Sequence, residues 1–262
     1  MRRLIAFPCV GETLVGSLDP ASGSAGLLIV SAGNEIRCGA HRGMALLAQR
    51  LAAAGHPVFR YDRRGVGDST GDNRGLRESA PDIAAAAATF AAEVPQLRRL
   101  VAFGNRDAAA ALTLFHCAAG VDALVLANPA TMDAEDALPR SAARGHHDER
   151  LRDPRQWLRL ASGGVNLGKL FRGLRKVSDK KSEMLDGLAG ELMQALATIA
   201  VPVTILLAER DKTAIAFARA WDRAGQPGAT TTLLRRPTAN HSFASVEDKQ
   251  WLFERVLAAL RT

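Results

Sequence analysis

Three separated segments of this chain carry side chains of the types that act together in acyl transfer. Residues 104–108 read GNRDA and follow an apolar stretch, which is the spacing of a sharp strand-to-helix turn that presents its central side chain to a substrate. Asp211 and His241 come later in the chain. In acyl transfer a histidine serves as general base and an acid orients its ring. The order of these segments therefore predicts a nucleophile, acid and base arrangement.

The central residue of the turn is Arg106, at the position that a nucleophile would occupy. A guanidinium stays protonated in proteins and cannot attack a carbonyl carbon. Acyl transfer through a covalent intermediate requires such an attack. Position 106 therefore decides whether the other two residues can support this chemistry.

Asp211 and His241 each have a second interpretation. Asp211 follows an apolar stretch at 205–207 and precedes a helical one, so it could orient the histidine or cap the helix, and both roles are compatible. Glu209 is the substitute acid. His241 follows the last expected strand, although a surface histidine is the alternative. As a working pair, Asp211 and His241 should lie about 2.6–3.2 Å apart.

Strand-like and helix-like segments alternate from residue 26 onward. Expected strands cover residues 27–31, 57–61, 100–103, 121–127, 201–207 and 230–234, and expected helices cover 45–54, 79–94, 107–118, 214–221 and 246–260. Repeated strand–helix units predict an α/β fold with a mostly parallel central sheet and helices on both faces. The first 20 residues instead suggest an antiparallel hairpin at one sheet edge. Residues 131–198 break the alternation.

Four further motifs carry a family resemblance. RYDRRGVGDS at 60–69 matches the pattern R-x-D-x-R-G-x-G-x-S, and LAQRLAAAG at 47–55 precedes it. RCGAHR lies at 37–42 and ANHSF at 239–243. Together they resemble the α/β-hydrolases, and they are most similar to the exosortase A system-associated hydrolase 1 type of bacteria.

The resemblance implies an α/β-hydrolase core at 1–130 and 199–262, with a helical cap insertion at 131–198. It implies ester or thioester hydrolysis in an exopolysaccharide or protein-sorting setting, and an association with exosortase machinery. The turn in that family usually reads G-x-C-D-G/A with cysteine as nucleophile, and this chain departs from it at Arg106.

The same resemblance assigns supporting roles. The amide of Asp107 would donate to an oxyanion, and the loop at Gly33 and Asn34 would supply the second donor. Asp62, Arg64 and Ser69 match family positions. We interpret them as a polar network that braces a loop, with Asp62 paired to Arg60 or Arg64.

Four hypotheses remain open for a chain with arginine at this position. The turn could survive as structure only, in a catalytically silent protein that binds a ligand or partner. Asp107 could attack, although it lies one residue out of register. His241 and Asp211 could activate water directly. Cys38, in the loop near the expected oxyanion site, could be a displaced nucleophile.

Composition limits the remaining function classes. The net charge is +7, and residues 140–181 hold 12 Lys and Arg against 4 Asp and Glu, so one segment carries the whole surplus. That segment could be a solvated face, attract an acidic ligand, or contact a membrane surface or partner protein. A local surplus and the absence of phosphate-binding motifs argue against nucleic acid and nucleotides.

The remaining expectations concern cofactors and location. The 3 cysteines are scattered without motif spacing, which argues against disulfides and against a metal site. No long apolar run indicates a transmembrane segment. We expect a cytoplasmic protein without a cofactor, acting on a small-molecule ester or acidic ligand.

Overall fold

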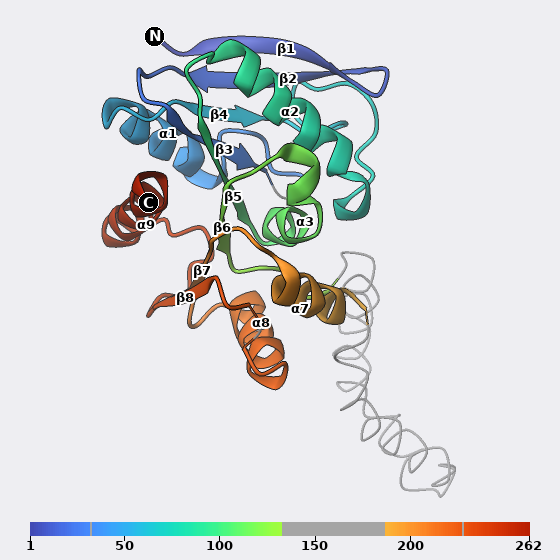
Figure 1. The fold of residues 1–262 in the computed structure, drawn as a ribbon, viewed down its shortest axis with the longest axis vertical. Helices are drawn as coiled ribbons and strands as arrows, with labels where there is room; N and C mark the ends of the chain where they lie inside the picture. Colours follow the sequence, from blue (N-terminus) through green and yellow to red (C-terminus); the bar gives the residue numbers. More distant parts are fainter. Residues whose placement is uncertain (32, 133–186, 227) are drawn as a thin grey trace, which may run out of the picture. The chain divides into compact units, whose positions relative to one another are not determined.

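One sheet of eight strands organises the part of the chain that the structure describes (Figure 1). The computed structural model describes residues 1–31, 33–132, 187–226 and 228–262. The strand order is β1-β2-β4-β3-β5-β6-β7-β8. The strands are β1 Arg3–Cys9, β2 Glu12–Asp19, β3 Ala25–Val30, β4 Val58–Tyr61, β5 Arg99–Asn105, β6 Ala123–Ala127, β7 Val203–Ala208 and β8 Thr231–Arg236. The helices are α1 Gly43–Ala53, α2 Ala80–Glu93, α3 Asp107–Phe115, α7 Leu188–Thr198, α8 Lys212–Arg223 and α9 Val246–Arg261, with short 3-10 turns at Ala40–Arg42, Leu76–Glu78 and His116–Ala119.

The N-terminal hairpin is antiparallel and forms the edge of the sheet, as the sequence predicts. β1 pairs with β2, and Val10 and Gly11 make the turn with φ values of 49° and 80°. Two consecutive residues with positive φ give a turn whose twist matches that of paired strands. β2 is also antiparallel to β4, whereas the strands from β4 to β8 run parallel to their neighbours.

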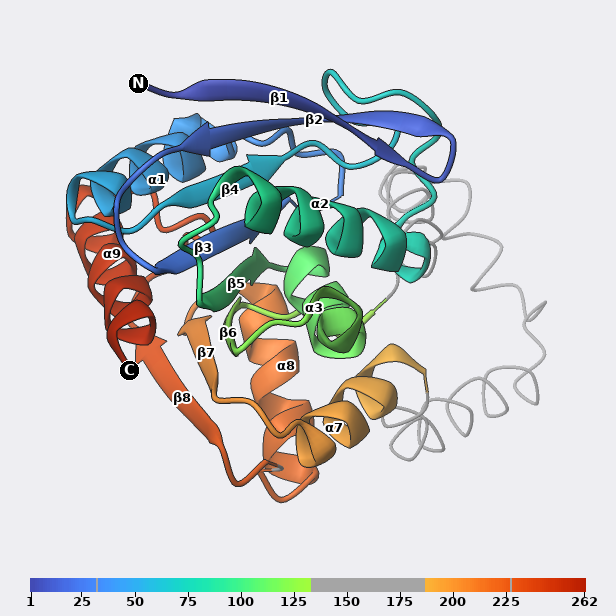
Figure 2. The ribbon, with the colours of Figure 1, turned by 45° about the horizontal axis from the view of Figure 1, so that its top comes forward.

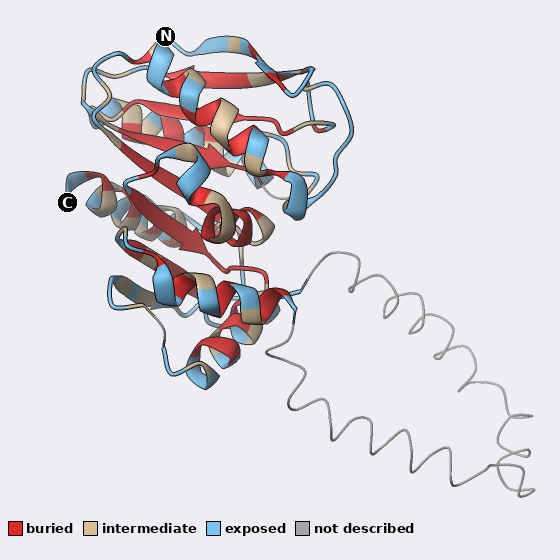
Figure 3. Ribbon diagram, turned by 45° about the vertical axis from the view of Figure 1, so that its right-hand side comes forward, coloured by how far each residue is buried: buried red, intermediate tan, exposed pale blue. Residues whose placement is uncertain are grey.

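The parallel strands are buried because helices cover both faces of the sheet. Figures 1 and 2 show α1 and α9 against one face and α2 and α3 against the other. Figure 3 shows the central strands buried along their length, and every residue of β4 and β6 is buried. This explains their continuous apolar sequences. The carboxyl ends of parallel strands meet at one sheet edge, where α/β proteins place their sites.

The chain divides into two compact units, Met1–Thr131 with Glu191–Thr262, and Met132–Gly190. The basic stretch at 140–181, like most of the insertion expected at 131–198, lies outside the described residues. Within the described ranges, no helix is long and apolar enough to cross a membrane.

Candidate functional site

Arg106 occupies a sharp turn between β5 and α3. Its backbone angles are φ 54° and ψ −116°, a combination that side chains other than glycine rarely adopt. Hydrogen bonds hold both sides of this residue. Its N–H donates to the Ala127 carbonyl at 2.9 Å, and its carbonyl accepts from the amides of Ala110 at 3.1 Å and Ala130 at 3.2 Å. The turn therefore keeps the bent conformation that would present a nucleophile, with arginine at its centre.

Gly104 and Ala108 are small because the turn is tight. A Cβ added to Gly104 would lie 2.6 Å from the backbone carbon of Ala108 and 2.8 Å from the amide nitrogen of Ala109. Backbone atoms of a helix cannot move away as a flexible side chain can. The G-x-x-x-A spacing in the sequence thus follows from the close approach of β5 to the first turn of α3.

Asn128, at the end of β6, links three segments of the site. It is fully buried, and its amide nitrogen donates to the Asn105 side-chain oxygen at 3.2 Å and to the His241 carbonyl at 3.1 Å. Its side-chain oxygen accepts from the Ala208 amide at 2.8 Å. Asn105 also donates to the His241 carbonyl, at 3.0 Å. The main chain at His241 is therefore fixed to the turn.

The sequence analysis missed Asn128 as a site residue. An Asn-Pro pair after an apolar stretch reads as the end of a strand, and in the sequence nothing connects it to residue 241. Its φ of 43° provides a second reason for asparagine, which tolerates the left-handed region better than most residues.

His241 and Asp211 lie near each other without a hydrogen bond. His241 Nδ1 is 3.7 Å from Asp211 Oδ2, beyond the expected 2.6–3.2 Å. The other carboxylate oxygen of Asp211 accepts from the amides of Thr213 at 2.9 Å and Ala214 at 3.2 Å, which caps α8. One oxygen of Asp211 thus serves as the helix cap while the other faces the histidine. The substitute acid Glu209 has an exposed side chain.

A cavity of about 250 Å³ collects most of the residues expected at the site. Its lining residues are Gly33, Asn34, Glu35, Asn105, Arg106, Asp107, His241 and Ser242. Asp211 is not among them. The cavity therefore combines the turn, the loop after β3 and the histidine loop.

Arg106 is half-buried and is one of the residues that line this cavity. The sequence predicts that it reaches Asp211, Glu209, Asp107, another acid or solvent. In the described part of the chain, no ion pair or side-chain hydrogen bond engages its guanidinium. Asp211 is thus not diverted from His241 by an ion pair with Arg106.

The loop at Gly33 is braced from the segment that follows β4. The Gly33 carbonyl accepts hydrogen bonds from the Arg63 guanidinium and, at 3.3 Å, from the Asn73 amide. Asn73 also donates to the Asn34 side-chain oxygen at 2.7 Å. Sequence reasoning did not single out Arg63 or Asn73, although Arg63 lies inside the R-x-D-x-R-G motif. The motif therefore contacts the cavity loop through Arg63, a position to which the sequence analysis gave no role.

Asp62 does brace a loop, but its expected partners were wrong. Its carboxylate accepts from the Arg37 guanidinium and amide and from the Asp68 amide. Burial by itself lowers the pKa of Arg37, but the carboxylates of Asp68 and Asp62 outweigh burial and raise it. Ser69 donates to the Asp62 carbonyl at 2.7 Å.

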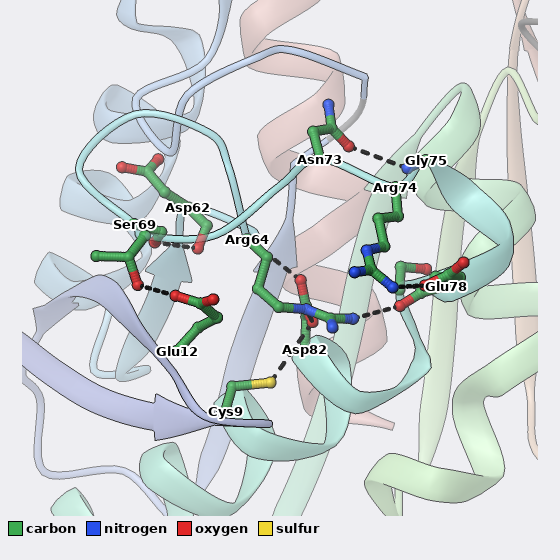
Figure 4. A network of polar contacts seen from close by, with 12 residues as sticks. Cys9, Glu12, Asp62, Arg64, Ser69, Asn73, Arg74, Gly75, Glu78 and Asp82 are labelled. Atoms are coloured by element: carbon green, nitrogen blue, oxygen red, sulfur yellow. Dashed lines mark hydrogen bonds and ion pairs between the residues drawn. The ribbon is translucent and has the colours of Figure 1, made fainter.

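The two arginines expected to pair with Asp62 have other partners. Arg60 is buried in β4 and pairs with Asp19 of β2 at 3.2 Å, and burial lowers its pKa. Arg64 pairs with Asp82 at 2.5 Å, as Figure 4 shows. Strand pairing brings Asp19 to Arg60, and helix α2 brings Asp82 to Arg64. The spacing of these residues along the sequence predicts neither ion pair.

Cys38 does not lie where a displaced nucleophile would act, because it does not line the Arg106 cavity. It is half-buried, its thiol donates to the Gly39 carbonyl at 3.7 Å, and it is absent from the cavity lining. Among the described residues, no group of three or more His, Cys, Asp or Glu side chains could hold a metal ion.

Solved structures share this fold at low sequence identity. An esterase of Pyrococcus furiosus, Pf2001, is 15% identical with a TM-score of 0.68, covering 100% of this chain and 92% of that one. GrgF of a Penicillium species, an alpha/beta hydrolase, is 17% identical with a TM-score of 0.65, covering 100% and 98%. XC6422 of Xanthomonas campestris, a serine hydrolase without a lid, is 14% identical with a TM-score of 0.60, covering 99% and 94%.

This chain has the α/β-hydrolase fold. The eight-stranded sheet and the turn at Arg106 agree with that assignment, which the sequence resemblance predicts. No protein-family model and no curated protein matches the chain. TM-scores of 0.60–0.68 establish the α/β-hydrolase fold, whereas identities of 14–17% leave the activity to be argued from the site.

Proposed function

We propose that this α/β-hydrolase-fold protein binds a small carboxylate at Arg106 and forms no acyl-enzyme. One observation carries the proposal: Arg106 lines the cavity, and its guanidinium has no ion-pair partner among the described residues. A guanidinium presents paired N–H donors whose spacing matches a carboxylate. A ligand carboxylate would supply the missing partner.

Neighbouring charges favour a ligand of charge −1 over a dianion. Arg106 immediately precedes α3, whose first amides have no acceptor within the helix and favour an anion. Asp107 and Glu35 also line the cavity and oppose negative charge. The balance supports a monocarboxylate and disfavours dianionic phosphate.

The biological setting that we propose comes from the motif resemblance. The protein would act in the cytoplasm of a bacterium with an exosortase and exopolysaccharide system, alone or associated with that machinery. Its ligand would be a free carboxylic acid, or the acid released from an ester, from that system. The ligand proposal requires that the cavity binds a carboxylate.

Calorimetric titration with acetate and inorganic phosphate tests the binding function. We expect acetate to bind more tightly than phosphate, and Arg106→Gln to weaken acetate by about 10- to 100-fold, because a hydrogen bond to a charged group contributes about 1.5–3 kcal/mol. Arg210→Gln, which removes an exposed arginine outside the cavity lining, is the matched control. Equal acetate affinity in the wild type and Arg106→Gln would reject the proposal.

Hydrolysis of a small ester by activated water is a second candidate function. It is favoured by the position of His241, which lines the cavity with Asp211 Oδ2 3.7 Å from its Nδ1. In this mechanism Arg106 would stabilise the developing oxyanion.

Aryl ester hydrolysis separates the two candidates. For a binding protein, we expect wild-type rates close to the uncatalysed reaction and a higher rate in Arg106→Cys, because the bent turn would then present a thiol. Robust wild-type hydrolysis that is lost in His241→Ala would instead establish water activation.

A further inference from the structure

A second cavity, of about 420 Å³, lies between α1 and α9. Its apolar lining residues are Gly43, Met44, Leu46, Leu47, Ala53, Phe243 and Leu252, and its polar ones are Gln49, Arg50, Ser242 and Lys249. We call this the α1–α9 groove. Figures 1 and 2 show the two helices side by side on one face of the sheet. The volume is in the range of small-molecule sites, which are mostly apolar with a few polar groups.

The groove and the Arg106 cavity share a lining residue, Ser242. His241 on one side of it belongs to the Arg106 cavity, and Phe243 on the other side belongs to the groove. A cationic site and an apolar groove therefore border the same residue. A ligand that satisfies both has an anionic head and an apolar tail.

The space around Gly43 is open where α1 begins. A Cβ added to Gly43 would meet no heavy atom within 4 Å, and the φ of Gly43 is −57°, which any residue adopts. The backbone therefore does not require glycine here, and the missing side chain leaves space in the groove. Toward the other end of α1, the Arg50 guanidinium donates to the Gln250 side-chain oxygen at 2.5 Å and lies 4.0 Å from the centre of the Phe253 ring.

We propose that the α1–α9 groove binds the alkyl chain of a fatty-acid carboxylate whose head is held by Arg106. The inference rests on the proposed function and names its ligand class. The chain would pass Ser242 and lie against Met44, Leu47 and Leu252. Lys249, at the groove, is the competing position for the carboxylate.

Titration of acetate and octanoate tests the groove. Each buried methylene strengthens binding about fourfold, so even partial burial should make octanoate bind at least tenfold more tightly than acetate. Gly43→Leu fills the groove without backbone strain. We expect this variant to reduce octanoate to the affinity of acetate and to leave acetate unchanged. Ala258→Leu, on an exposed position of α9 outside the groove, should behave as the wild type.

Different results overturn the two proposals. Equal affinities of the wild type for acetate and octanoate, or an octanoate advantage that persists in folded Gly43→Leu, would reject the groove while carboxylate binding at Arg106 stands. A larger loss in Lys249→Gln than in Arg106→Gln would place the head in the groove and reject the shared arrangement. An unchanged acetate affinity in Arg106→Gln would reject the proposed function itself.

Discussion

At the scale of single residues, Arg106 has the backbone conformation that would present a nucleophile, although its guanidinium cannot act as one. A non-glycine residue in such a sparsely populated region costs about 1–3 kcal/mol, and it persists only where the surroundings hold it. Here the surroundings are the carbonyl of Ala127 and the amides of Ala110 and Ala130. The conformation is therefore imposed by neighbouring backbone and does not depend on the chemistry of the side chain.

Arg106→Gly should stabilise the protein relative to Arg106→Ala. Both variants remove the guanidinium, but only glycine adopts φ 54° without strain. The relief is offset in part by the greater freedom of glycine in the unfolded chain, so we expect a net gain of about 1 kcal/mol. Urea denaturation measures the difference. If alanine is the more stable of the two, the turn is not strained.

Sequence reasoning finds the site residues that are marked by their type and their order along the chain. It misses the residues whose role depends on a contact with a distant segment. Arg106, Asp107 and His241 are found because each follows an expected strand, β5 for the first two and β8 for the histidine, and the structure brings them to one cavity. Asn128 and Arg63 are missed because each acts through a main-chain carbonyl on another segment. Neither periodicity nor spacing in the sequence can predict a hydrogen bond to a main-chain carbonyl on a distant segment.

At the scale of elements, the site depends on how closely β5 approaches α3. Only hydrogen at Gly104 allows the first turn of the helix to pack against the strand. Gly43, by contrast, begins α1 with open space around it. Two glycines that look alike in the sequence thus have opposite structural requirements.

Gly104→Ala should destabilise the fold by about 1–3 kcal/mol, because the added methyl would overlap helix backbone. Gly43→Ala is the matched control and should be neutral or slightly stabilising, since alanine favours a helix. Thermal or urea unfolding of both variants measures this contrast. Equal effects of the two substitutions would contradict the packing argument.

The connection from β8 to α9 carries the histidine loop, and an ion pair closes it. Arg236 Nε donates to Asp248 Oδ1 at 2.8 Å. Burial tends to raise the pKa of Asp248, but hydrogen bonds from Arg236, Thr238 and Ser245 outweigh burial and lower it. The ionised carboxylate is therefore bound more favourably in the folded protein than in the unfolded chain.

Asp248→Asn should lower stability at neutral pH, by about 1.5–3 kcal/mol, and less in acid. Because the folded pKa is depressed, the stabilisation is present above the unfolded pKa of about 3.9 and is lost as pH falls through the folded value. Urea denaturation between about pH 7 and pH 3 measures the gap between wild type and variant. Glu247→Gln, an exposed neighbour, should show little change. A gap independent of pH would disprove the assignment.

The sequence predicts the type of an element where its apolar run is long, but it does not predict where the element begins and ends. The predicted strand at 100–103 extends to Arg99–Asn105, and the predicted helix at 107–118 ends at Phe115 and continues as a 3-10 turn. Strand ends are set by pairing with neighbours, such as Asn105 with Ala127, which the local sequence does not contain.

At the scale of the whole molecule, the cysteines sample different environments. Cys9 is buried at the end of β1, Cys38 is half-buried and Cys117 is exposed. Burial and the nearby Asp82 carboxylate raise the pKa of the Cys9 thiol to about 11. At pH 8 about one Cys9 thiol in a thousand would be ionised, and only the thiolate reacts readily.

Thiol labelling at pH 8 should therefore modify Cys117 first and Cys9 only when the protein unfolds. We expect peptide mapping by mass spectrometry to show Cys9 protected in buffer and labelled in denaturing urea. A Cys117→Ser variant should lose the fast phase. Labelling of Cys9 as fast as that of Cys117 in the native protein would show that β1 opens locally.

Positions 106 and 241 are suited to protein engineering because main-chain hydrogen bonds hold them both. Asn105 and Asn128 hold the carbonyl of residue 241, and neither bond involves the imidazole. Position 106 is likewise held by its own peptide groups. The hydrogen bonds that fix the main chain at positions 106 and 241 therefore do not depend on which side chains these residues carry. A designer can exchange the two residues as a pair, installing new reactive groups at a fixed separation without rebuilding the scaffold that carries them.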